Sequence, residues 1–529
     1  MKKVFLCSVA ALALAACGGS TTDSATVDEA LVQLSLKESG SGRVDFEDQS
    51  ISGADATFKN VLIHTSDFDT SDDVEDEFDS AGVELDTEGS DILISEMVLA
   101  GLSMDDAGIA NFKRMTLNSL KAVPGEGEEP SDVDVTAEMV ELVEPTAELA
   151  AWLAGVFGTA EPSDIPEPEN IQFKSFKMKN FLAEGLDDEG EEARFAIASV
   201  SADEVTDLKI GDMAIEGMDL MFTDPDSGSQ GVFTLGKIGL KGMSTDLIKA
   251  MSEDDEEAAN DLLQTMYGNP VDPGFDGFVL TDMLFDMDGL NVSLPSMTYD
   301  VSRNKDGVPT RFNMPKFTLK VDADDAGGDI GAQVATALLS VGFESLEITG
   351  EGVSTYDPET DIATGEKSRF AIKDALTLEM TSKVGGLTKL GEVMQEMDSE
   401  AFASGEQDPQ AMVMDMYSEL DFYQLSFTIT DDGVVDKALM FFAAQQGADP
   451  EQLRQLAVGT VQSLPAMASG FGVDPALATE LSGAIASFLT DGGALTLSFD
   501  PEEPFTIDTF MGDPTLATKA RLGFTATTE

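Results

Sequence analysis

Histidine and cysteine are scarce in this chain, and each scarcity excludes a kind of site. The single histidine, His64, excludes a zinc site of the HExxH type, which needs two histidines on one helix. His64 lies in an alternating strand pattern close to Asp67, and a structural role is favoured over a place in a catalytic triad. The two cysteines are Cys7, in a leader-like segment, and Cys17, so the mature chain lacks a pair for an intramolecular disulfide.

Basic residues are also few. The chain has 30 lysines and arginines against 100 aspartates and glutamates, a formal net charge of −70. Loss of Lys2 and Lys3 with a leader removes two positive charges and gives −72. A polyanion repels nucleic acid, so nucleic acid is excluded as a partner. The composition is typical of a protein surface in a saline medium, where salt screens repulsion beyond about 8 Å.

The apolar run at the N-terminus is short. Val4 to Ala16 follows Lys2 and Lys3 as in a signal peptide, and it is shorter than the roughly 20 residues that span a bilayer. The residues Leu14-Ala15-Ala16-Cys17 resemble the lipobox of bacterial lipoproteins. This resemblance implies cleavage before Cys17, lipidation of Cys17 and attachment to a membrane through acyl chains. Gly18 resembles the outer-membrane sorting signal of Gram-negative bacteria, so we expect a lipid-anchored protein of the cell envelope, with the outer membrane favoured.

Sequence patterns for catalysis and cofactors are missing. The chain has no G-x-S-x-G nucleophile elbow, no G-x-x-x-x-G-K-[ST] phosphate loop and no dinucleotide-binding glycine pattern after a strand. We therefore expect a protein that is not an enzyme and holds no cofactor. An unrecognised hydrolase built on His64 is the least favoured alternative.

An acidic run from Asp67 to Asp79 contains the candidate cation ligands. Calcium takes about six to eight oxygen ligands, which such a run supplies. The EF-hand spacing fails in every register, because no glycine falls at its sixth position. A solvated loop is favoured, with loose association of a divalent cation as the alternative. The weak calcium candidates are Asp67, Asp69, Asp72, Asp73 and Glu75.

An apolar repeat organises the middle of the chain. Its copies are apolar at relative positions 1, 3, 6, 8 and 11, with glycine or asparagine at 10. The odd step from position 3 to position 6 moves side chains to the other face of a strand unless a bulge or bend absorbs one residue. Each copy is predicted to be a strand, a bulge or corner, and a second strand ending in a turn. The copies are "ILISEMVLAGL" from Ile92, "IQFKSFKMKNF" from Ile171, "LKIGDMAIEGM" from Leu208, "FTLGKIGLKGM" from Phe233 and, except at its last position, "VGFESLEITGE" from Val341.

The local signals also predict particular turns and helices. Asn180 replaces glycine in one copy of the repeat, which predicts a positive φ there. Hairpin turns are expected at residues 304–307 and near Asp357. Asp449-Pro450 and Asp474-Pro475 each place a capping acid before a proline, the start signal of a helix. Further helices are expected over residues 146–157 and 434–446.

The fold class that follows is mainly β with a helical C-terminal segment. Long antiparallel, repetitive strands form an extended or curved sheet, with about three to five helices near the C-terminus. The expected domains are a signal peptide (1–16), lipidated Cys17 with a flexible tether (17–30), a β-repeat body (31–390) with a sub-boundary near 124–170, a helical segment (391–490) and C-terminal strands that close the β body (491–529).

The repeat also bears on function. Over about half the chain it resembles the repetitive β segments of AsmA-like and DUF945-type envelope proteins, although AsmA-like proteins usually carry an N-terminal transmembrane helix. The resemblance implies lipid handling between membranes. The favoured function is a non-catalytic scaffold that binds an envelope protein, and the alternative is binding or transfer of lipid acyl chains in a β groove. An open apolar surface lined by methionine and leucine favours lipid, whereas a closed sheet-on-sheet core favours the scaffold.

Overall fold

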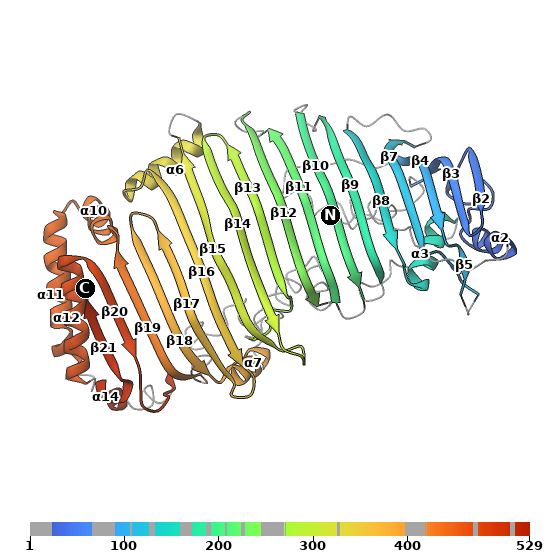
Figure 1. The fold of residues 1–529 in the computed structure, drawn as a ribbon. Coiled ribbons are helices and arrows are strands. Elements are labelled where there is room, and N and C mark those ends of the chain that lie inside the picture. Colours follow the sequence, from blue (N-terminus) through green and yellow to red (C-terminus); the bar gives the residue numbers. More distant parts are fainter. Residues whose placement is uncertain are drawn as a thin grey trace. The chain divides into compact units, whose positions relative to one another are not determined.

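The computed structural model is mainly β with a helical C-terminal segment, as predicted. Its strands form an open antiparallel sheet (Figure 1). The chain divides into two compact units, residues 1–248 and 249–529. The structure describes residues 24–65, 90–105, 108–125, 133–158, 172–186, 192–206, 209–223, 228–244, 269, 271–324, 328–396, 418, 420–468, 474–507 and 514–529.

The first unit is an antiparallel meander. From β3 onward each long strand pairs with the next along the chain, and β3 also pairs with β1 and β2. The short strands β5 and β6 pair with each other. The strands are β1 (Val44–Asp45), β2 (Asp48–Ser52), β3 (Asp55–Ile63), β4 (Ser90–Ala100), β5 (Ser103–Met104), β6 (Ala110–Asn111), β7 (Arg114–Pro124), β8 (Val133–Val143), β9 (Phe173–Leu186), β10 (Glu192–Val205), β11 (Lys209–Thr223) and β12 (Gln230–Ser244).

Two helices complete the core of the first unit at its N-terminal strands (Figure 1). Leu31 of α2 (Ser24–Gln33) and Phe157 of α3 (Ala147–Phe157) are fully buried with Phe58. The predicted helix over 146–157 is confirmed, and the Thr146 hydroxyl caps it by accepting a hydrogen bond from the Leu149 amide. Helix α2 begins inside the segment expected to be a flexible tether, because its apolar side chains join the core.

The second unit is also an antiparallel meander, from β13 to β21. Its strands are β13 (Gly277–Met287), β14 (Leu290–Arg303), β15 (Pro309–Ala323), β16 (Ser345–Asp357), β17 (Ile362–Ile372), β18 (Leu376–Gly385), β19 (Asp421–Asp431), β20 (Gly493–Phe499) and β21 (Phe524–Thr528). Its helices are α6 (Asp329–Ser340), α7 (Leu387–Glu396), α10 (Val434–Gln446), α11 (Pro450–Ala468), α12 (Pro475–Asp491), α14 (Lys519–Leu522) and the 3-10 turn η4 (Pro514–Leu516).

The local predictions in this unit are confirmed. The hairpin turns fall between β14 and β15 and between β16 and β17. Helices α11 and α12 begin at the two prolines, and the Asp474 carboxylate accepts a hydrogen bond from the Ala476 amide. Helix α10 ends before Gly447, which adopts the left-handed conformation with a φ of 63°. Phe488 of α12 packs with Val435 of α10 and Leu495 of β20 in a small core.

Of the helices in the described residues, none combines the length and the apolar character needed to cross a membrane.

Candidate functional site

The apolar residues of the first unit form continuous rows across its sheet. Directly opposed residues of neighbouring strands point to the same side of a sheet, so the strand register defines each row. We call the side that carries these rows the apolar face. One row contains Phe58, Met97, Leu117, Val140, Met178, Val200, Ile215 and Ile238, and the next contains Ala56, Leu99, Met115, Leu142, Phe176, Ala202, Met213 and Leu240.

Left-handed residues bring a third row, which contains Phe181, Ile197, Met218 and Leu235, onto the same face as these two rows. Asn180 in β9 and Gly217 in β11 have φ of 47° and 64°, and the register skips both of them and Ala198 in the strand between. Because each strand carries its extra residue at the same level, the pairing stays in register while the alternation is reset. The same conformation occurs in β3 at Asn60 and in β7 at Ser119. The positive φ predicted for Asn180 is therefore confirmed.

The repeat differs from the prediction in one respect. Within β11 both halves of the repeat, which are separated between Ile210 and Met213, and the left-handed residue Gly217 belong to one continuous strand, and not to two strands with a turn at the end. The physical reason is that the neighbouring strands bend at the same level, so backbone hydrogen bonding continues on both sides of the bend.

Burial falls along the first row of the apolar face. In the first row Phe58 and Met97 are 0% exposed, Val140 is 2% and Met178 is 8% exposed. Further along the row Val200, Ile215 and Ile238 are only half-buried. Helices α2 and α3 belong to the core of the first strands, and the apolar face of β10–β12 keeps part of its surface accessible.

The opposite side of the same strands is charged and paired. Lys237 of β12 forms an ion pair with Glu216 of β11 at 2.7 Å, and Arg194 of β10 pairs with Asp219 of β11 at 2.7 Å. The hydrogen bond and the charge of Lys237 lower the pKa of Glu216. The sheet of the first unit is therefore amphipathic, with an apolar face and a charged face.

The second unit repeats this arrangement. At the C-terminal strands helices α10 and α12 cover its apolar row by packing on Ile429 and Leu495. Away from those helices the side chain of Phe370 in β17 is 40% exposed. The row contains Phe317, Gly350, Phe370, Leu378, Ile429 and Leu495.

An open hollow of about 620 Å³ lies at the ends of β8–β12. Phe222 and Ala193 are among its apolar lining residues, and Asp134, Glu184 and Glu192 contribute carboxylates. The one arginine in its lining, Arg194, is paired with Asp219. The hollow therefore combines an apolar wall with an acidic rim.

His64 lies between two carboxylates. Its Nδ1 is 2.8 Å from Asp91 Oδ2, and its Nε2 is 3.2 Å from Asp45 Oδ2. Burial alone would lower the pKa of His64, but the hydrogen bonds and charges of Asp45 and Asp91 outweigh burial and raise it. Asp91 also accepts a hydrogen bond from the Thr65 amide. Both ring nitrogens thus face carboxylates, an arrangement that joins β1, β3 and β4 and stabilises an imidazolium.

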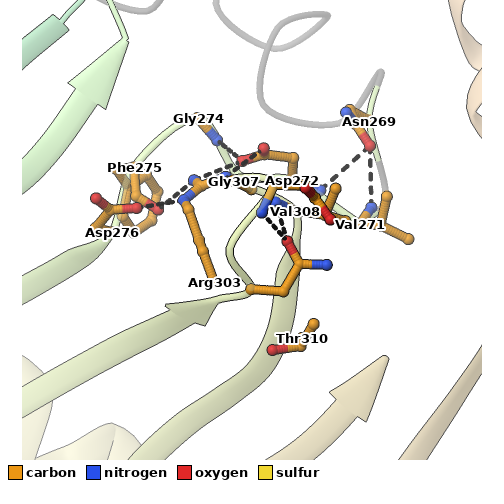
Figure 2. Close-up of polar contacts among 12 residues, drawn as sticks. Asn269, Val271, Asp272, Gly274, Phe275, Asp276, Arg303, Gly307, Val308 and Thr310 are labelled. Atoms are coloured by element: carbon orange, nitrogen blue, oxygen red, sulfur yellow. Dashed lines mark hydrogen bonds and ion pairs between the residues drawn. The ribbon is translucent and has the colours of Figure 1, made fainter. Parts of the chain in front are cut away.

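A second polar cluster surrounds Arg303 (Figure 2). Its two terminal nitrogens donate to the carboxylate of Asp272 at 2.6 and 2.9 Å, and Nε donates to Asp276. It also donates to the carbonyl oxygens of Phe275 and Gly307. The hydrogen bonds to Asp272 are the largest cause of the raised pKa of Arg303. The cluster fastens the segment before β13 to the β14–β15 hairpin, and its donors are occupied by the protein itself.

The site residues predicted from the sequence are outside the part of the chain that the structure describes. Cys17 and the calcium candidates Asp67, Asp69, Asp72, Asp73 and Glu75 lie outside the described residues. Within the described part of the chain no three histidine, cysteine or acidic side chains are grouped to hold a metal ion. Sequence reasoning found the apolar repeat but not the cross-strand rows, because rows depend on which strands pair.

Comparisons with known proteins carry little functional information. A family model described as "Uncharacterized protein" matches residues 369–529, from β17 to the end of the chain. No curated protein matches the sequence.

Proposed function

We propose that this protein binds lipid acyl chains on the apolar face of its sheet, without catalysing a reaction. The observation that carries the proposal is the set of continuous apolar rows in which Val200, Ile215 and Ile238 are only half-buried. Each apolar side chain removed from water contributes about 1.5–3 kcal/mol when it is fully buried, so covering these rows with an acyl chain is favourable.

Methionines add to the fit of this surface. Met213 and Met218 of β11 lie half-buried in the two rows that flank the row of Ile215. Unbranched, polarizable methionine side chains adapt to apolar ligands of irregular shape. An amphipathic sheet with a partly accessible apolar side thus suits a flexible chain better than a rigid polar substrate.

Native mass spectrometry of the protein without its leader and Cys17 tests the proposal. We expect co-purifying lipid on the unmodified protein and its loss in Ile215→Asp, because an unpaired carboxylate on the apolar face would have to be buried against the acyl chain. Ala214→Asp is the matched control, since Ala214 is the adjacent residue and pairs with Ser201 in a row of the charged face. Lipid-free protein, or equal lipid on both variants, contradicts the proposal.

A partner-binding scaffold is the second candidate, favoured by helix α11. None of its residues is buried, and Leu456 and Met467 on its outer side are 66% and 58% exposed. Large exposed apolar side chains on one helix are a feature of protein-binding surfaces. Chemical cross-linking in cells tests this role: we expect adducts through α11 to disappear in Leu456→Ser/Met467→Ser, and unchanged adducts count against it.

We also propose that lipidated Cys17 anchors the protein in the cell envelope, with the outer membrane of a Gram-negative bacterium favoured. The lipobox-like residues Leu14 to Cys17 support this location. An anchored acyl-chain carrier would act next to the membranes that supply its ligand.

A further inference from the structure

We infer that the ligand class is uncharged or zwitterionic lipid, and that lipids with a net negative headgroup are excluded. The inference rests on the proposed function and specifies its ligand. An anionic headgroup needs a cation or a set of hydrogen-bond donors to replace the water it loses. The placement of the lysines and arginines relative to the apolar face therefore decides which headgroups the protein can hold.

The lysines and arginines of strands β8–β12 in the first unit lie away from the apolar face. In the rows of the charged face Lys177 is opposed by Glu141, Lys237 by Glu216 and Lys241 by Asp212. Lys179 is opposed by Ser199, and Arg194 is opposed by Glu184. These rows also belong to the charged face. Of the two remaining cations of the described strands β8–β12, Lys174 is ion-paired with Glu144 at 3.1 Å, and Lys209 is opposed by Ser244.

The second unit follows the same rule. Arg369 is opposed by Glu351 and Glu379, and Lys320 is opposed by Glu347. The Lys367 ammonium lies 2.7 Å from the Glu351 carboxylate. These pairs belong to rows that alternate with the row of Phe317 and Phe370, so the cations again lie on the side away from the apolar residues.

The net charge of the chain reinforces the exclusion. The chain as a whole carries a formal charge of −70, whose field repels an anionic headgroup before contact. An uncharged or zwitterionic headgroup avoids this repulsion.

Competition binding on the full-length chain, purified in detergent and stripped of bound lipid, tests the inference. The reporter is a fluorescent diacylglycerol, and the competitors are unlabelled dioleoylglycerol, phosphatidylcholine and phosphatidylglycerol with the same acyl chains. We expect dioleoylglycerol and phosphatidylcholine to displace the reporter at a concentration at least about tenfold lower than phosphatidylglycerol requires. This difference in displacing concentration, called the selectivity gap, should be smaller at high salt. Equal displacement by phosphatidylglycerol overturns this inference but leaves the proposed function. If neither the reporter nor any of the three competitors binds, the proposed function itself is overturned.

A gain-of-binding variant locates the effect on the apolar face. Ile215→Lys supplies a cation on that face. We expect this variant to narrow the selectivity gap of phosphatidylglycerol at least severalfold, without making dioleoylglycerol a better competitor. Ala214→Lys adds the same charge to the adjacent residue on the other face and should leave the gap unchanged. An equal effect of both variants would show that overall charge governs selection, and it would overturn the assignment to the apolar face.

Discussion

At the scale of single residues, the left-handed backbone of a few positions determines which face of the sheet is apolar. Gly217 has a φ of 64°, and a Cβ added there would lie 2.7 Å from the Cβ of Ala198 in the neighbouring strand. Asparagine in the same conformation at Asn180 was predictable from its place in the repeat. The identical conformation of Ser119 was not predictable, because serine carries no comparable preference.

Gly217→Ala should therefore destabilise the protein by about 1–2 kcal/mol, through the left-handed backbone and the contact with Ala198. Urea unfolding measures the change. Gly459→Ala is the control, because Gly459 lies in helix α11 with open space around it. The control should gain about 0.5–1 kcal/mol, and a Gly217→Ala variant as stable as the unmodified protein would contradict the role given to the bend.

His64 predicts a pH dependence with a definite sign. Its pKa is raised in the folded protein, so its contribution to stability is complete below the unfolded value of about 6.5 and is lost as pH rises through the folded pKa. The difference in unfolding free energy between the unmodified protein and His64→Gln should be largest below about pH 6.5 and should shrink as the pH is raised above that value. A difference that stays constant or grows with pH contradicts the imidazolium between Asp45 and Asp91. The sequence did not indicate these partners, because they come together only through the pairing of β1, β3 and β4.

At the scale of elements, signals close together in the sequence predicted best. Asp474 followed by Pro475 marks the start of α12, and the Asp-Gly of residues 306–307 marks the β14–β15 turn. Each signal acts through hydrogen bonds within a few residues. The clamp at Arg303 was not predicted, because Asp272 and Asp276 are distant from it in sequence and reach it only when the hairpin forms.

The clamp has a measurable effect on stability. Arg303→Met leaves the carboxylates of Asp272 and Asp276 without their charged donor, and we expect a loss of about 1.5–3 kcal/mol in unfolding free energy. Lys305→Met, in the same turn, removes the same charge from a side chain that is 89% exposed and should change stability by less than about 0.5 kcal/mol. Equal effects of the two substitutions would show that Arg303 acts only through net charge.

At the scale of the whole molecule, the composition predicted a strongly acidic surface and the repeat predicted the β class. The signals change from strand to helix near residue 391, and the compact units of the structure are residues 1–248 and 249–529. A boundary between compact units depends on which strands pair. Helices α10 and α12 pack on the last strands of the second unit and so belong to that unit.

The proposed anchor makes a prediction at this scale. Cys17→Ser removes the sulfur that would carry acyl chains, and burial of each methylene is worth about 0.8 kcal/mol of membrane affinity. We expect the variant to remain unprocessed or to appear in the soluble fraction after cell lysis, as followed by immunoblot. A cleaved Cys17→Ser protein that stays firmly in the membrane fraction contradicts the anchor.

Photo-cross-linking in intact cells tests the acyl-chain face most directly. A photoreactive benzophenone amino acid is placed at residue 215 on the apolar face or at residue 214 on the charged face, and the purified protein is analysed for attached lipid by mass spectrometry. The prediction is lipid adducts at 215 and none above background at 214, because adjacent residues of a strand point to opposite sides. Adducts at both positions, or at neither, would contradict a lipid-binding apolar face.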